Sequence, residues 1–155
     1  MRAWDEGVYL RTTTGRELAD LRDTVVSDRV QFAALLLSRG NRLVASTPPH
    51  YRDAISRFYY SMYHAMRAAV YYDYGGDDHQ AHSALPRSTP ASFPDRELWS
   101  NRLKSARERR NGADYDPYPK AESAWRDSAV ELQTQAEQLL RVTRRFLRDL
   151  GCDLR

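Results

Sequence analysis

One segment between two strong breaks limits what this chain can fold into. Pro48 and Pro49 precede the segment, and Gly75 and Gly76 follow it, so one regular element fits between them. Apolar side chains recur there every three or four positions, which is the period of a buried helix face. They are Ala54, Phe58, Met62, Ala65, Ala69 and Tyr72. We therefore predict a long helix from Tyr51 to about Tyr74.

The rest of the chain repeats this spacing and contains no competing strand pattern. We predict a short helix at Arg16 to Val26, a second helix behind a Ser27 N-cap, a third from Asp95 to about Asn111, and a fourth from Lys120 to Leu150. Gly112 should end the third helix, and Gly151 should end the fourth. The expected apolar stripes are Val30, Ala33, Ala34, Leu37 and Val44, then Leu98, Trp99, Leu103 and Ala106, then Ala129, Leu132, Ala136, Leu139, Thr143, Phe146 and Leu150. The fold class that this predicts is all-α, an antiparallel, up-and-down bundle of four to five helices.

The length and composition suit a single domain. The 155 residues, 41% of them apolar, are enough to bury one core. We expect an N-terminal arm at 1–26 that could hold a short helix, a helical bundle at 27–150, and a C-terminal tail at 151–155. Residues 75–94 contain three prolines and predict a long loop, with room for one helical turn around His79 to Leu85. Long loops often carry function.

Charge and cysteine content narrow the class of protein. A net charge of +3 permits a polyanionic partner without requiring one. A single cysteine, Cys152, excludes an internal disulfide. With no apolar run of about 18 residues, we expect a soluble cytoplasmic protein that does not contact a membrane. Asp77, Asp78, His79 and His82 lack the spacing of known metal sites, so we expect no metal and no cofactor.

Polar side chains form a row on the predicted helix at 51–74. Arg57, Tyr60, His64 and Arg67 are spaced three, four and three apart, which places them on one face. Such a row can bind an anion or a carboxylate. The alternative is structural: Tyr60 and His64 pack with satisfied hydrogen bonds, while the arginines reach solvent or pair with acids of a neighbouring helix.

The predicted third helix is locally basic and ends in a marked segment. Six basic and two acidic residues lie at 96–110, a balance of +4. Arginines at a helix end suit phosphate contacts, although a solvated helix face accounts for the same pattern. The segment RRNGADYDPY at 109–118 follows, with two tyrosines and two aspartates. Its Asn-Gly pair is typical of a turn, Tyr115 and Tyr118 could cap the bundle, and Asp114 could orient Arg110 or Arg57.

Together the two marked segments resemble the HEPN family, the helical nucleotide-binding domains of higher eukaryotes and prokaryotes. SRFYYSMYHAMRAA at 56–69 is similar to the second-helix signature of a bacterial and archaeal subgroup, a Ser-Arg-x-Tyr-Tyr start followed by an aromatic-His-Ala step and an arginine. RRNGADYDPY is similar to that subgroup's Arg-x-x-Ala-Asp-Tyr element at the end of the third helix. In architecture the resemblance covers roughly Ser27 to Leu150.

The resemblance implies a homodimer whose third-helix motifs face a shared cleft, and metal-independent cleavage of RNA. In active members an arginine and a polar residue are followed by a histidine. The 2′-hydroxyl attacks the adjacent phosphate, the histidine handles protons, and the arginine stabilises charge. Arg110 and Asn111 match the first two positions of this motif.

The motif histidine is missing from this chain. Asp114 and Tyr115 stand where it is expected, and neither side chain has an ordinary pKa suited to proton transfer at neutral pH. His64, from a neighbouring helix, is the better-placed replacement, and His82 in the long loop is the second. The catalytic candidates are therefore Arg110, Asn111, Asp114, Tyr115 and His64. The candidates for binding RNA or a nucleotide are Arg57, Tyr60, Arg67, Arg107, Arg109 and Tyr118.

Two other functions remain open. In the first, the chain is a non-catalytic HEPN partner of a nucleotidyltransferase in a toxin–antitoxin or defence setting. Arg57, Arg67 and Arg110 would then hold a phosphate or nucleotide, and Tyr115 or Tyr118 could accept a nucleotidyl group. In the second, the chain is a purely structural helical dimer, with a buried polar network that fixes its register.

Overall fold

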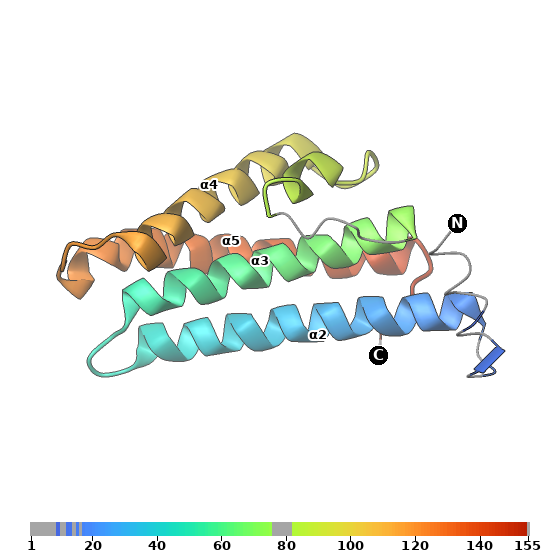
Figure 1. The fold of residues 1–155 in the computed structure, drawn as a ribbon, viewed down its shortest axis with the longest axis horizontal. Coiled ribbons are helices and arrows are strands. Elements are labelled where there is room, and N and C mark those ends of the chain that lie inside the picture. The colour runs from blue at the N-terminus through green and yellow to red at the C-terminus, as the bar shows by residue number, and fades with distance from the viewer. Residues whose placement is uncertain (1–8, 10–11, 14, 16, 76–81, 155) are drawn as a thin grey trace.

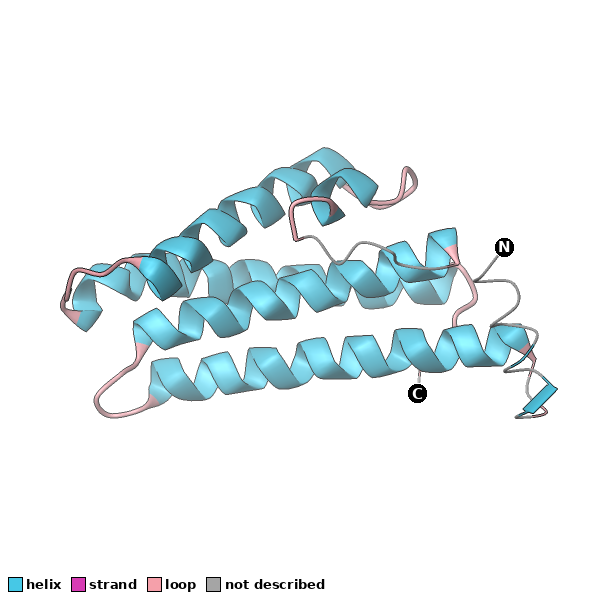
Figure 2. Cartoon of the chain, viewed as in Figure 1, coloured by secondary structure: helices cyan, strands magenta, loops and turns pink. Residues whose placement is uncertain are grey.

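A computed structural model describes residues 9, 12–13, 15, 17–75 and 82–154. Its described part is an all-α bundle, as Figure 2 shows. The long helices are α2 (Leu18–Ala45), α3 (Tyr51–Tyr74), α4 (Arg96–Tyr115) and α5 (Arg126–Asp149), and two short 3₁₀ turns are η1 (Leu85–Ser88) and η2 (Glu122–Trp125). This confirms the predicted fold class.

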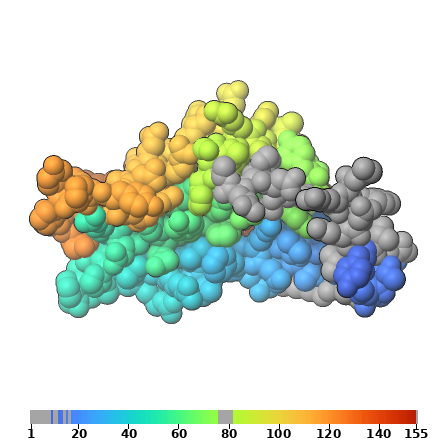
Figure 3. All heavy atoms as spheres, viewed as in Figure 1, coloured from blue at the N-terminus to red at the C-terminus, as the bar shows by residue number. Residues whose placement is uncertain are grey.

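The long helices alternate in direction, and α3 contacts the other three. Figure 1 shows α2 and α3 side by side along most of their length, with α5 behind α3 and α4 inclined to α3 and diverging from it. In the space-filling view of Figure 3, α3 forms the surface between the ridge of α4 and the α2 helix. Within the described ranges, no helix has the length and apolar character needed to cross a bilayer.

Helix α3 matches its prediction at both ends. The six apolar side chains expected on its buried face are all buried. Its end is fixed at Gly75, whose φ of 72° lies in the left-handed region that favours glycine, and whose N–H donates to the Tyr71 carbonyl at 2.9 Å. Because α3 is nearly surrounded, its sequence pattern is the clearest in the chain.

Helix α2 differs from its prediction. It runs without interruption from Leu18 to Ala45, so the expected break between a short helix and a Ser27 cap is wrong. Ser27 is buried inside the helix instead. The buried positions continue through Val26 and Val30 on the side that packs on α3, and this burial outweighs the weak preference of serine for a helix start. The expected domain boundary at residue 27 therefore falls within α2.

The ends of α4 and α5 also differ from prediction. Helix α4 passes through Gly112 and ends at Tyr115, and Asp95 before it makes no side-chain cap bond. Helix α5 begins at Arg126, after η2, and ends at Asp149. Two expected stripe residues, Leu98 and Leu150, are exposed. Leu98 lies one position before the buried Trp99, so it faces away from the core.

The described part of the long loop is anchored to the bundle. Leu85 and Phe93 are buried, and the Phe93 ring packs 4.9 Å from that of Phe146 on α5. The Ser100 hydroxyl of α4 donates to the Pro86 carbonyl at 2.8 Å. The turn expected at 79–85 lies partly outside the described residues, and the described 3₁₀ turn follows it at Leu85–Ser88. These contacts hold the described part of the loop, which begins at His82, against the helices.

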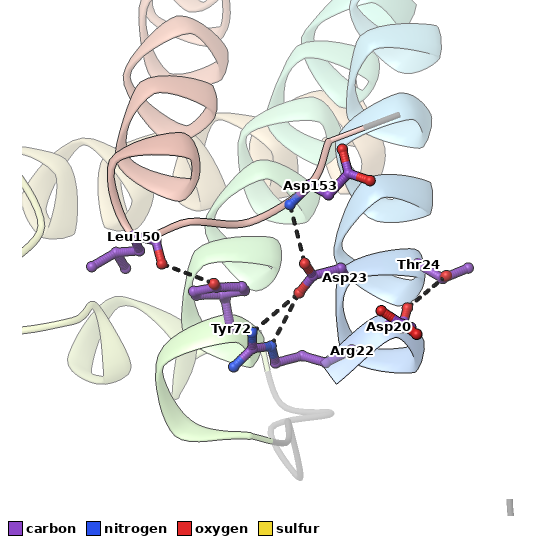
Figure 4. Close-up of polar contacts among 7 residues, drawn as sticks. All are labelled: Asp20, Arg22, Asp23, Thr24, Tyr72, Leu150 and Asp153. Carbon is purple, nitrogen blue, oxygen red and sulfur yellow. Dashed lines mark hydrogen bonds and ion pairs between the residues drawn. The ribbon is translucent and has the colours of Figure 1, made fainter. Parts of the chain in front are cut away.

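The C-terminal tail packs against the end of α3 and the start of α2, as Figure 4 shows. Tyr72 donates its hydroxyl hydrogen to the Leu150 carbonyl at 3.0 Å. The backbone N–H of Asp153 donates to Asp23 of α2 at 3.1 Å. Arg22 pairs with Asp23 and lies 4.0 Å from the Tyr72 ring. These contacts tie the end of the chain to the start of α2 and the end of α3.

Candidate functional site

Helix α4 places an arginine where its packing pattern calls for an apolar side chain. The buried residues of α4 are Trp99, Leu103, Ala106, Arg110 and Ala113, spaced four, three, four and three apart. Arg110 therefore belongs to the core stripe, and only 8% of its surface is exposed. A charge in such a position costs free energy unless it is paired. Its contacts are thus the first place to look for function.

The guanidinium of Arg110 has only part of its hydrogen-bonding capacity in use. Its Nη1 donates to Asp114 Oδ2 at 3.3 Å. Its central carbon lies 5.2 Å from the Tyr59 ring and 5.5 Å from the Tyr60 ring, so it rests among aromatic faces. The Nε is buried, and within the described residues it has no hydrogen-bond partner. The fold therefore leaves one buried donor of Arg110 without an acceptor.

A second buried guanidinium nitrogen lies on the same helix, one turn earlier. The Nε of Arg107 is also without a partner among the residues that the structure describes. Arg107 and Arg110 both act electrostatically on His82, which places the three side chains in one neighbourhood. We call this site the Arg110 cluster. It consists of Tyr59, Tyr60, His82, Arg107, Arg110 and Asp114.

His82 joins the cluster from the loop. Its Nδ1 lies 2.7 Å from the Tyr59 hydroxyl oxygen, a hydrogen-bonding distance. Its ring stacks on that of Tyr63, with centroids 4.3 Å apart. The buried Leu85, three residues later, holds this part of the loop against the bundle. His82 is thus a positioned imidazole beside a buried arginine.

The protonation states in the cluster follow from burial and from its arginines. Burial raises the pKa of Tyr59 to about 12, although the positive charge of Arg110 opposes this shift. Burial also lowers the pKa of His82, and Arg110, Arg67 and Arg107 lower it further. At neutral pH the tyrosine is therefore protonated and the histidine is neutral. A neutral imidazole can accept a proton.

Helix α3 holds the end of α4 in place through residues that the sequence patterns did not single out. Arg52 donates from Nε to the Ala113 carbonyl at 2.6 Å and from Nη2 to the Asp116 carbonyl at 2.8 Å. The Ser56 hydroxyl donates to Asp114. Carbonyls at a helix end lack partners within the helix, so Arg52 satisfies two of them and fixes the turn that carries Asp114.

Several predicted site residues are brought together. Arg110, Asp114, Tyr60 and Arg107 belong to the Arg110 cluster. Tyr115 lies at its rim, with 73% of its surface exposed and its ring 5.9 Å from the Arg110 guanidinium. The guanidinium of Arg67 lies 5.4 Å from the Tyr63 ring and acts on His82, so it faces the same side.

Other predicted residues lie elsewhere. The described contacts place His64 edge-on against Phe32 of α2, with ring centroids 4.7 Å apart, and it is His82 that bonds Tyr59. Arg109 turns toward α5 and donates to Glu131 at 2.6 Å. The remaining three are exposed: Arg57 borders α2, Asn111 lies on α4, and Tyr118 lies in the connection to η2. Asp77, Asp78 and His79 are outside the described residues.

The arrangement has the chemistry of a site for a phosphate group. Two buried guanidinium nitrogens have no described acceptor, aromatic rings lie against the guanidinium of Arg110, and a neutral histidine belongs to the same cluster. Comparison with known protein families, with curated proteins and with solved structures finds no match to this chain.

Proposed function

We propose that the Arg110 cluster binds a phosphate group of single-stranded RNA or of a nucleotide, as the resemblance to HEPN domains implies. One observation carries the proposal. Arg110 is only 8% exposed, yet its Nε has no partner within the described parts of the chain. A phosphate oxygen is a strong acceptor for such a donor, and arginine suits phosphate geometry.

The competing interpretation is a polar network that only fixes the packing of α4. The ion pair between Arg110 and Asp114 agrees with that interpretation, because the two residues are four apart on one helix. The unused Nε atoms of Arg107 and Arg110 favour a ligand, because buried donors ordinarily have an acceptor, although the structural side chains of Trp99, Trp125 and Thr143 also have a buried polar atom without a described partner. Ligand binding accounts for both observations.

Oligonucleotide binding tests the proposal. The probe is a fluorescent single-stranded RNA with 2′-O-methyl groups, which cannot be cleaved through its 2′-oxygens, and the readout is fluorescence anisotropy. Arg110→Gln should weaken binding by about tenfold or more, since it removes a charge-assisted contact. Arg109→Gln is the matched control, because it removes the same charge one residue away, where the side chain pairs with Glu131. Equal affinities of the two variants would contradict the proposal.

A second candidate function, cleavage of the bound strand, is favoured by the position of His82. Its neutral imidazole lies in the same cluster as Arg110 and can take the proton of a 2′-hydroxyl. The 2′-oxygen then bonds to phosphorus as the bond from phosphorus to the 5′-oxygen breaks. The proton ends on the 5′-oxygen, and the products are a 2′,3′-cyclic phosphate and a 5′-hydroxyl. Arg110 would stabilise the charge that builds on the phosphate oxygens.

The biological setting rests on the resemblance alone. We extend to this chain the homodimer and the toxin–antitoxin or defence context of HEPN domains, with a nucleotidyltransferase as partner. Light scattering on the purified protein tests the dimer. Co-purification with a nucleotidyltransferase encoded beside it tests the partner, and transfer of a nucleotidyl group to Tyr115 or Tyr118 would appear as a mass increase.

A further inference from the structure

A second arginine group lies beside the Arg110 cluster, on the side of α3 that borders α2. Arg39 and Arg42 of α2 and Arg57 of α3, together with Leu43, line a hollow of about 360 Å³. All three arginines are exposed. We call them the Arg57 triad.

The charge around the triad is positive. The chain has no aspartate or glutamate between Asp28 and Asp53, so the last four turns of α2 carry positive charge only. Asp53 lies one turn before Arg57 on α3, and among the described residues it forms no ion pair with it. Three arginines around one hollow repel each other unless an anion lies between them. The hollow therefore has the charge of an anion site.

The triad and the cluster are neighbours along α3. Arg57 and Tyr60 are three residues apart on one helix face, about 4.5 Å along its axis. Tyr60 faces Arg110, with 5.5 Å between its ring and the guanidinium. Ser56, next to Arg57, bonds Asp114, the partner of Arg110. One extended ligand can therefore contact both groups.

We propose that the Arg57 triad binds a second phosphate of the strand held at the Arg110 cluster, so that the ligand of this protein is a single-stranded polynucleotide and not a mononucleotide. This inference rests on the proposed function. Aromatic surfaces accompany the arginines, as in other single-strand sites: Tyr60 lies between the two groups and the exposed Tyr115 lies at the rim. Phosphates fix the path of the strand, and the rings stack its bases.

The test is a length series of 2′-O-methyl oligonucleotides, from two to twelve nucleotides, measured by anisotropy at several salt concentrations. Wild-type affinity should rise with length. The double variant Arg39→Gln/Arg42→Gln should bind the dinucleotide as the wild type does but lose about tenfold for the twelve-mer. The slope of log affinity against log salt should fall by about 0.7 for each phosphate that the variant no longer neutralises.

The control variant is Arg87→Gln/Arg126→Gln, which removes the same charge from exposed positions of η1 and α5 whose surroundings also contain acidic residues. It should keep the gain with length. Equal losses in both double variants, or an equal gain with poly-glutamate of matched charge, would overturn the polynucleotide site. If Arg110→Gln weakens the dinucleotide while Arg39→Gln/Arg42→Gln changes nothing, only the second site fails. If Arg110→Gln has no effect on any probe, the proposed function itself fails.

Discussion

The Tyr59 hydroxyl oxygen lies 2.7 Å from His82 Nδ1, which joins a core position of α3 to a loop residue 23 positions later. The pKa of Tyr59 is raised to about 12 and the pKa of His82 is lowered, so neither group is charged at pH 7. The tyrosine hydroxyl can donate or accept, so it supports either tautomer of the imidazole. Nε2 of His82 is the ring nitrogen left for a substrate.

Replacing this histidine should separate binding from cleavage. We expect His82→Asn to bind the 2′-O-methyl oligonucleotide within about twofold of wild type and to lose cleavage by about 100-fold or more, the usual range for general acid–base catalysis. Cleavage is measured on unmodified RNA with a chelator present. The wild-type rate should rise with pH and reach half of its plateau value below pH 6.5, because the pKa of His82 is lowered from 6.5. His64→Asn, treated in parallel, should cleave as wild type; loss in His64→Asn alone would contradict the role of His82.

The raised pKa of Tyr59 should make the free energy of unfolding fall at alkaline pH. Its pKa of about 12 exceeds the unfolded value of 10.0, so its contribution to stability is full below pH 10 and is lost as pH rises toward 12. Urea unfolding between pH 9 and pH 11 should show a shallower fall in stability for Tyr59→Phe than for wild type. Tyr118→Phe, at a position that is 73% exposed, should follow the wild-type curve. The same slope in all three proteins would contradict the buried titration.

Removing the charge of Arg110 should not weaken the fold. Arg110 occupies an apolar stripe position with an unsatisfied Nε, so we expect Arg110→Met to keep or raise the melting temperature while binding is lost. Leu103→Ala, on the same stripe, should cost about 2–5 kcal/mol of unfolding free energy. A drop for Arg110→Met as large as that for Leu103→Ala would favour the structural network.

Two helix glycines should respond in opposite directions to alanine. A Cβ at Gly40 would lie 2.7 Å from Cδ1 of Phe58, so Gly40→Ala should lower the unfolding free energy by about 1–2 kcal/mol, despite the better helix propensity of alanine. Gly112 in α4 has open space around it, and Gly112→Ala should gain about 0.5–1 kcal/mol. Urea unfolding measures both. A gain at Gly40 would show that α2 and α3 are less tightly packed than the structure has them.

The local sequence was enough to predict α3, but not the extent of α2. Helix α3 lies between Pro49 and Gly75 and has one apolar period, so its bounds can be predicted without knowing which helices pack against it. Ser27 has a real preference for helix starts, but that preference is worth less than the burial of the surrounding face, which depends on how α2 meets α3. Capping signals therefore failed where tertiary packing competed with them.

The candidate site was also predictable only in part: its α4 residues could be found from the sequence, and its loop residue could not. Arg110 and Asp114 stood in a marked segment, and the stripe of Trp99, Leu103 and Ala106 extends in register to Arg110 and not to Arg109. The spacing of these apolar residues in the sequence is therefore enough to predict that Arg110 is buried and that Arg109 is not. The contact of His82 with Tyr59 was not available, because it depends on how the loop is anchored, which no local pattern encodes.

The unused donors of the Arg110 cluster allow the most direct test. Arginine Nε–H signals can be followed by proton–nitrogen NMR and assigned with Arg107→Gln and Arg110→Gln. On addition of the 2′-O-methyl dinucleotide, we expect the Nε–H signals of Arg107 and Arg110 to shift and saturate together, while that of Arg109 stays in place. Saturable binding that leaves the Arg107 and Arg110 signals unmoved would show that the phosphate does not bind at the Arg110 cluster.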